Sequence, residues 1–222
     1  MAHKFLQQVQ KFESLGKNKR MNFVPIHING VKLLFMKMGR SAGTLIYKQH
    51  LVEAIKEYPS KSIDYRQGGP HWVNRITDEE ILNDYTVFIV TRNPFERVVS
   101  YYESLLKFGN YGGSQKYTFS KFINEQLLDK SGQLKLYPDN GHLLPISTHF
   151  ELDDGTKFVD HIIRFENLEE DWDNFCSKIK LNLGSLTNES QTVYQPYYDS
   201  RTRTIVGDFY KRDLELFNYS FN

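Results

Sequence analysis

Residues 86–102 read TVFIVTRNPFERVVSYY and carry the signal that decides the fold. The first five residues are apolar or β-branched, which is typical of a buried strand. Asn93 is a good helix cap and Pro94 a good first helical residue, and apolar residues then recur at helical spacing. The pattern predicts that Arg92 lies at the carboxyl end of a strand and that Ser100 lies two turns into the next helix. An arginine and a hydroxyl in these places can hold a phosphate between them.

A second junction between a strand and a helix lies near the start of the chain. Residues 33–38 predict a strand, and a helical pattern of apolar residues runs from Leu45 to Ile55. The turn between them, residues 39–44, reads GRSAGT, and its small residues let the backbone come close to an anion. Because backbone N–H groups are exposed at such a turn, we predict a second phosphate site there.

The two junctions together resemble the nucleotide site of sulfotransferases that use 3′-phosphoadenosine 5′-phosphosulfate (PAPS). In that family an Arg and a Ser eight residues apart bind the 3′-phosphate, and Arg92 and Ser100 have this spacing. The resemblance implies an α/β fold of three layers, P-loop-like, in which helices flank a central parallel sheet. It runs with gaps from about residue 33 to the end. We therefore expect a single sulfotransferase domain over residues 1–222, with its core at about 31–222.

The turn at residues 39–44 resembles the 5′-phosphosulfate loop of the carbohydrate-type members, which reads Pro-Lys-Thr-Ala-Gly-Thr. In an alignment without gaps, Arg40 takes the place of the lysine that contacts the leaving phosphate in that family. The other expected ligands of the phosphosulfate are Ser41, Ala42, Gly43 and Thr44. A second alignment gives the lysine role to Lys37. We favour Arg40 because Lys37 is expected to lie within the strand, although arginine is not a neutral replacement for lysine.

Two histidines are candidates near the acceptor, since histidine titrates near neutral pH and is the commonest general base. His71 follows a Gly-Pro pair in a loop-rich stretch, and this stretch resembles the region of uronyl 2-O-sulfotransferases that supplies the catalytic base. That resemblance makes His71 the expected base. Trp72 lies in the same loop-rich stretch, where an acceptor site is expected, and is a candidate contact of the acceptor. His142 belongs to a His-x-x-Pro segment that many family members carry. We expect His142 to contact the acceptor, with the base role as its alternative.

Further candidates come from the rest of the chain. Arg201 and Arg203 precede the pattern of a terminal helix, and both are expected near the 3′-phosphate or the adenine. Cys176 is the single cysteine, so no intramolecular disulfide can form, and its apolar surroundings predict a buried thiol. No cluster of His, Cys, Asp and Glu has the spacing of metal ligands, so we expect no metal.

Composition narrows the classes of partner. The formal net charge is only +1, which is not the electrostatic pattern of a protein that binds nucleic acid or a membrane surface. The first residues lack the apolar core of a signal peptide, and no stretch approaches the ~20 apolar residues of a membrane span. We therefore expect a soluble, cytoplasmic protein, as the bacterial members of the family are.

The sequence as a whole predicts transfer of a sulfuryl group from PAPS to an acceptor hydroxyl, on a saccharide, by in-line displacement with a histidine base. A P-loop nucleotide kinase is the first alternative, but its motif needs a lysine after Gly43, where this chain has Thr44. A catalytically inactive domain of the same fold, binding a nucleotide or a sugar, stays open because Arg40 departs from the family loop. The identity of the acceptor and the oligomeric state are left open.

Overall fold

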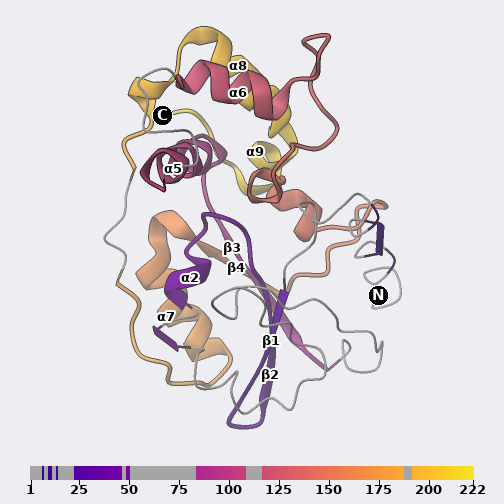
Figure 1. Cartoon of the computed structure of the whole chain (residues 1–222). Coiled ribbons are helices and arrows are strands. Elements are labelled where there is room, and N and C mark those ends of the chain that lie inside the picture. The colour runs from indigo at the N-terminus through magenta and orange to yellow at the C-terminus, as the bar shows by residue number, and fades with distance from the viewer. Residues whose placement is uncertain are drawn as a thin grey trace.

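The computed structural model describes residues 7, 10, 11, 14, 23–46, 49–50, 84–108, 117–187 and 192–222. Its strands are β1 (Phe23–Ile28), β2 (Val31–Met36), β3 (Thr86–Thr91) and β4 (His161–Arg164) (Figure 1). Its α-helices are α2 (Gly43–Ile46), α5 (Pro94–Lys107), α6 (Phe119–Leu127), α7 (Leu168–Lys178), α8 (Ser200–Phe209) and α9 (Lys211–Phe217). Its 3₁₀ turns are η3 (Gly141–Leu143), η4 (Ile146–His149), η5 (Phe165–Asn167) and η6 (Gln195–Tyr197).

The sheet has the strand order β1-β2-β3-β4. Strands β2, β3 and β4 are parallel, which confirms the predicted central parallel sheet. Strand β1 pairs antiparallel with β2 and forms an edge that we did not predict. Its hairpin turns at Asn29 and Gly30, whose φ angles of 49° and 79° are both positive, as the tight turns of hairpins require.

The junction between β3 and α5 has the predicted form. Strand β3 is buried from Val87 to its end, and Asn93 caps the helix by accepting a hydrogen bond from the N–H of Phe95 at 3.1 Å. Pro94 is the first helical residue, where its missing N–H costs no hydrogen bond. The turn therefore brings Arg92 and α5 to the carboxyl end of the strand.

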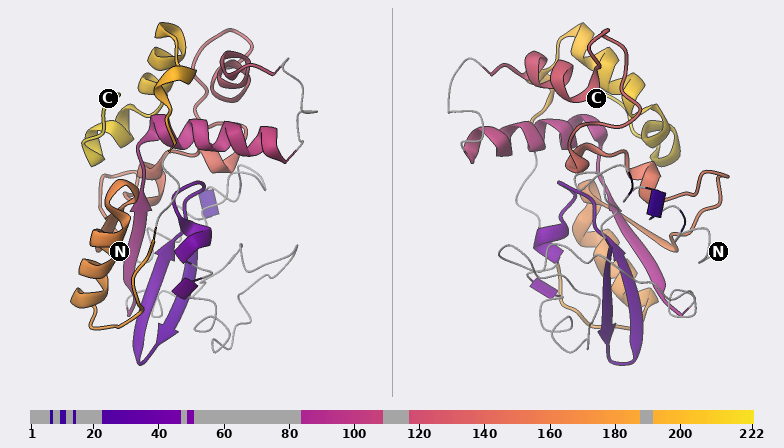
Figure 2. Two further views of the ribbon diagram at one scale, coloured as in Figure 1. Left: turned by 90° about the vertical axis from the view of Figure 1, so that its left-hand side faces the viewer. Right: turned by 45° about the vertical axis from the view of Figure 1, so that its right-hand side comes forward.

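Three apolar clusters hold the elements together. On one face of the sheet, Phe35 and Phe88 stack at 4.7 Å and pack against Trp172 and other residues of α7. The opposite face packs against residues 144–158 and Phe217 of α9. Helices α5, α6 and α8 share the third cluster and form a layer beyond the carboxyl ends of the parallel strands, which Figure 2 shows from two sides. The site described below lies between this helical layer and the sheet.

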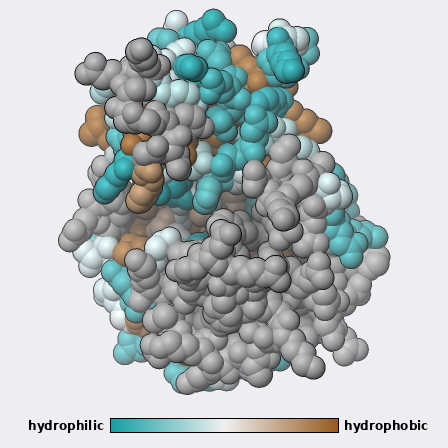
Figure 3. Space-filling model, viewed as in Figure 1, coloured by the Kyte–Doolittle hydropathy of each residue, from teal (hydrophilic) through white to brown (hydrophobic). Residues whose placement is uncertain are grey.

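The outer side of the helical layer is polar. On the face shown in Figure 3, the residues over α6 and α8 are mostly hydrophilic, and the exposed positions of these helices include Lys121, Glu125 and Arg203. Among the described residues, no helix combines the length and the apolar composition that a membrane span requires.

The strand boundaries differ from our expectation in one place that matters for the site. Strand β2 ends at Met36, so Lys37 follows the strand instead of lying within it, and the reason we gave for preferring Arg40 over Lys37 is wrong. The helix predicted from Leu45 to Ile55 begins at Gly43 and is described to Ile46. Most of the predicted span lies outside the described residues.

Candidate functional site

Arg92 and Ser100 meet at the carboxyl end of β3. The Nη1 atom of Arg92 lies 3.3 Å from the Ser100 hydroxyl oxygen, and both residues are buried, at 3% and 5% exposure. The guanidinium also lies over the ring of Phe165, 3.9 Å from its centre, so its plane is held from one side. The strand, the capped turn and the first two turns of α5 thus bring together the two residues that the sequence paired.

Glu96 fixes the direction of the Arg92 side chain. Its Oε1 atom accepts from Arg92 Nη2 at 2.8 Å and from the backbone N–H of Thr192 at 2.9 Å. The Thr192 hydroxyl lies 3.3 Å from the same Nη2 atom. A buried arginine needs such a partner because an unpaired buried charge is costly. Glu96 was missed in the sequence, although an acid four residues after Arg92 on a helix is a visible signal.

Arg40 points at the same hydroxyl. Its Nε and Nη2 atoms lie 3.2 and 3.0 Å from Ser100 Oγ, and its carbonyl oxygen accepts from Arg92 Nη1 at 2.9 Å. The backbone of Arg40 is left-handed, with φ at 64°. Partial burial and the positive charge of Arg92 lower the pKa of Arg40. The Arg40 side chain therefore lies beside Arg92 and Ser100, at the carboxyl end of β3.

Lys37 crosses the other part of the turn. A Cβ atom placed on Gly43 would lie 2.8 Å from Lys37 Cγ and 3.0 Å from its Cε, so the lysine chain runs closely over this glycine. Burial lowers the pKa of Lys37 to about 8, and the amine is therefore mostly protonated at neutral pH. This contact explains why position 43 is a glycine.

The loop also holds a buried hydroxyl. Ser41 has no exposed surface, and its Oγ has no hydrogen-bond partner in the described part of the chain. Ala42 is left-handed with φ at 52°, and Thr44 is exposed at the start of α2. A buried hydroxyl in this turn suits a ligand that offers acceptor oxygens.

His142 lies against the start of the turn. A Cβ atom on Gly39 would lie 2.6 Å from His142 Nδ1 and 2.8 Å from its Cα. The imidazole stacks on Tyr101 of α5, with 5.3 Å between ring centres. Burial, followed by the charges of Arg40, Lys37 and Arg97, lowers the pKa of His142 to about 4. The ring is therefore neutral at physiological pH.

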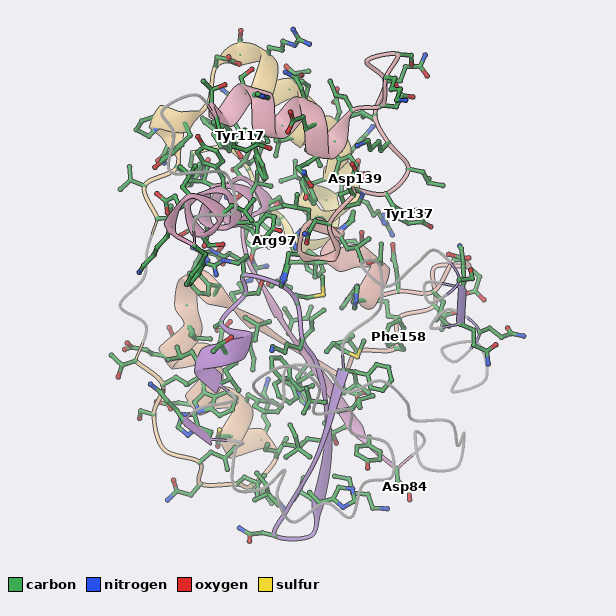
Figure 4. The ribbon with its side chains drawn as sticks, viewed as in Figure 1. Asp84, Arg97, Tyr117, Tyr137, Asp139 and Phe158 are labelled. Atoms are coloured by element: carbon green, nitrogen blue, oxygen red, sulfur yellow. The ribbon has the colours of Figure 1, made fainter. Side chains whose placement is uncertain are left out.

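A buried polar network holds the segment that carries His142. Arg97, which Figure 4 labels beside α5, donates to the carbonyls of His142 at 3.3 Å and Leu144 at 2.9 Å. The Tyr210 hydroxyl donates to the Leu143 carbonyl at 2.6 Å. Asp213 is fully buried and accepts from two backbone N–H groups of η4, at 2.7 and 2.8 Å. None of these groups was predicted, and together they fix His142 relative to α5.

Two further candidates contact residues other than Arg92 and Ser100. Arg201 Nη2 lies 3.4 Å from Asn124 Oδ1 of α6, and the Arg203 guanidinium lies 4.4 Å from the centre of the Phe221 ring. In neither case is the described partner Arg92 or Ser100. His71 and Trp72 lie outside the described residues.

Two expectations about reactive groups can be compared with the described residues. Cys176 is a buried free thiol, and burial raises its pKa to about 11. Within the part of the chain that the structure describes, no group of His, Cys, Asp and Glu side chains is arranged to hold a metal ion. The groups that meet at Ser100 are instead the guanidinium groups of Arg40 and Arg92, with Glu96 paired to Arg92.

The chain matches the model of the sulfotransferase family over residues 5–220. No curated protein and no solved structure matches it. The matched range contains both strand–helix junctions and the segment of His142, and it covers nearly the whole sequence. The chain therefore belongs to the sulfotransferase family.

Proposed function

We propose that this sulfotransferase moves the sulfuryl group of PAPS to a hydroxyl of a carbohydrate acceptor. The observation that carries the proposal is the contact between Arg92 and Ser100 beside the turn at residues 39–44. Strands β2 and β3 are parallel neighbours, so their carboxyl ends meet at one edge of the sheet, where α/β proteins bind their ligands. Both junctions that resemble PAPS-binding motifs lie at this edge.

The residues present suit a donor with phosphate groups at both ends. Arg92 and Arg40 supply guanidinium groups at Ser100, and the aliphatic chain that carries the Lys37 amine runs over Gly43. The buried Ser41 hydroxyl adds a donor on the loop side. This pattern supports a nucleotide with a 3′-phosphate and a 5′-phosphosulfate, because each anionic group would meet a cation and a hydroxyl.

We propose that Lys37 takes the role of the family lysine at the leaving phosphate. Its chain runs over the loop, whereas the Arg40 side chain is directed to Ser100. A protonated amine at this place stabilises the negative charge that grows on the leaving oxygen as the sulfuryl group departs. The backbone N–H groups of residues 41–44 are proposed to share this task.

A histidine is proposed to take the acceptor proton, and each of two candidates has its own support. His71 has the resemblance to the uronyl 2-O-sulfotransferases. His142 is held beside the turn in neutral form, which a base requires. The variants His71→Ala and His142→Ala separate them, since loss of the base lowers turnover ~10²-fold or more and leaves donor binding nearly unchanged.

The test of the donor is a calorimetric titration with adenosine 3′,5′-bisphosphate (PAP), the product of PAPS, beside ATP with Mg²⁺. We expect PAP to bind more tightly, and Arg92→Ala to weaken PAP by ~30-fold or more, as loss of a charge-assisted contact implies. Preference for ATP with Mg²⁺ would instead support the kinase alternative. Transfer of labelled sulfate from PAPS to a panel of saccharides then identifies the acceptor. PAP binding without transfer to any hydroxyl compound would favour the inactive domain.

A further inference from the structure

More N–H donors approach the hydroxyl oxygen of Ser100 than this oxygen can accept hydrogen bonds from. Three N–H groups approach its oxygen, namely Nε and Nη2 of Arg40 at 3.2 and 3.0 Å and Nη1 of Arg92 at 3.3 Å. A hydroxyl oxygen has two lone pairs, so it cannot accept all three well. A phosphate has three terminal oxygens and would satisfy both guanidinium groups. The Nε atom of Arg92 is also buried and has no partner among the described residues.

The charges at this place are not balanced. Glu96 pairs with Arg92 at 2.8 Å, but no carboxylate of the described residues lies within ion-pair distance of Arg40. Two guanidinium groups therefore converge on one uncharged oxygen, with Glu96 paired to Arg92 and the charge of Glu103 acting on Arg40 from beyond ion-pair distance. The mutual repulsion of the two guanidinium groups is unfavourable until an anion enters. The pKa of Arg40 is lowered first by burial and then by the charge of Arg92, while the charge of Glu103 raises it.

The backbone of the turn directs the Arg40 side chain. Arg40 occupies the left-handed region, which residues other than glycine seldom adopt, and such a residue often marks a functional site. Its carbonyl accepts a hydrogen bond from Arg92, so one arginine holds the turn that presents the other. This arrangement links the loop at residues 39–44 to the carboxyl end of β3.

We infer that Arg40 is a third ligand of the 3′-phosphate, beside Arg92 and Ser100, and that it sets the selectivity of this chain for 3′-phosphorylated nucleotides. The inference rests on the proposed function. In the family, the lysine with which Arg40 aligns contacts the 5′-phosphosulfate end of the donor. The inference instead assigns Arg40 to the 3′-phosphate end. The same turn then contacts both ends of the nucleotide, with Arg40 at the 3′-phosphate and Lys37 at the phosphosulfate.

The experiment measures selectivity for the 3′-phosphate by calorimetry in the full chain. The three ligands are PAP, adenosine 5′-monophosphate and adenosine 2′,5′-bisphosphate, which carries the charge of PAP at a different position. The wild type should bind PAP most tightly. In Arg40→Gln, the ratio of PAP affinity to monophosphate affinity should fall about 10- to 100-fold, because a charge-assisted contact to the phosphate is lost.

Three comparisons make the result specific. Arg212→Gln removes an exposed guanidinium of α9 that pairs with Glu151, and it should leave the ratio unchanged. Lys37→Met should lower turnover about 100-fold with the ratio unchanged, since its proposed contact is with the leaving phosphate. Arg40→Lys keeps the charge but loses the two-pronged contact, so it should have an intermediate ratio. This last variant also keeps the test decisive if Arg40→Gln folds poorly.

The outcomes separate the inference from the proposed function. If Arg40→Gln keeps the wild-type ratio while its turnover falls, Arg40 acts at the leaving phosphate and the inference is wrong, although the function stands. If the wild type itself does not prefer PAP to the monophosphate, the proposed donor fails. A combined Arg40→Gln and Ser100→Ala variant should lose less than the sum of the single losses, because the two side chains share one ligand.

Discussion

Replacing Gly39 by alanine tests the contact on which the geometry of the site depends. The added methyl carbon would lie 2.6 Å from His142 Nδ1, 2.8 Å from its Cα and 3.0 Å from its Cβ. Rotation of the imidazole relieves the first contact but leaves the second, which involves the backbone. Either the turn at residues 39–44 or the segment that carries His142 must therefore move.

Both of these segments are held by hydrogen bonds, and this determines the size of the effect. Movement of the His142 segment disturbs the bonds that Arg97 and Tyr210 make to the carbonyls of residues 142–144. Movement of the turn disturbs the bond from Arg92 to the Arg40 carbonyl. Overpacking costs about 1–3 kcal/mol, and a lost buried hydrogen bond adds about 1 kcal/mol. We expect Gly39→Ala to lower the free energy of unfolding by about 3 kcal/mol.

Thermal unfolding measures this loss, with a second glycine as the matched control. A loss of about 3 kcal/mol corresponds to a fall in Tm of about 6–12 °C in a chain of this size. Gly207 lies within α8, and a Cβ there would make an ordinary contact of 3.7 Å with Phe95. Because alanine is the better helix former, Gly207→Ala should raise stability by about 0.5–1 kcal/mol.

The reasoning would be refuted by a Gly39→Ala variant with the Tm and the PAP affinity of the wild type. That result would mean that the turn does not pack against His142. The double variant Gly39→Ala, His142→Ala adds a further check. It should recover only part of the PAP affinity lost in Gly39→Ala, because the contact with the backbone Cα remains.

Three further predictions concern the charged groups of the site. Asp213→Ala removes the acceptor of two buried N–H groups and a carboxylate whose charge interacts with Arg97, so it should cost about 4 kcal/mol in urea unfolding. The control is Ala at the exposed Asp208, which should cost under ~1 kcal/mol. Folding lowers the pKa of His142 from its ordinary 6.5 to about 4, so the unfolded chain binds more protons between these two pH values. The stability that His142 contributes should be complete above pH 6.5 and should fall by about 3 kcal/mol as the pH drops to 4. His142→Gln should remove this part of the pH dependence of stability. Lys37 has a pKa of about 8, so the turnover supported by its protonated amine should decline above pH 8, and Lys37→Met should abolish that decline in a pH–rate profile at saturating donor.

The sequence predicted the junction between β3 and α5 because every signal there is local. The apolar run, the cap at Asn93 and Pro94 lie within nine residues, and strand and helix geometry places Ser100 near Arg92, while Glu96 and Phe165 hold the Arg92 side chain. Strand β1 was missed although its signal was local too. Asn29 and Gly30 form the dipeptide that most strongly favours a hairpin.

The direction of the Arg40 side chain could not be predicted in this way. It depends on a left-handed backbone angle and on a hydroxyl sixty residues away in the sequence. The path of Lys37 over Gly43 likewise depends on where β2 ends, and strand ends are uncertain by a few residues when read from sequence.

The buried network of Arg97 and Asp213 was missed for a different reason. Charged residues are mostly exposed, so nothing in the composition indicated that these two are fully buried. Their partners are backbone groups of residues 142–147, which have no recognisable sequence pattern. The position of His142 against Gly39 is therefore a tertiary property.

The bond between Glu96 and the Thr192 amide provides a native spectroscopic reporter. One carboxylate oxygen of Glu96 accepts from both Arg92 and this N–H. A nucleotide that draws Arg92 toward its phosphate therefore changes the strength of the hydrogen bond between the Thr192 amide and Glu96. The Thr192 amide resonance should move, and its solvent exchange rate should change, in step with occupancy of the site. Nucleotide binding can thus be followed from a single backbone amide of the isotope-labelled protein, without a change of sequence, an acceptor or turnover.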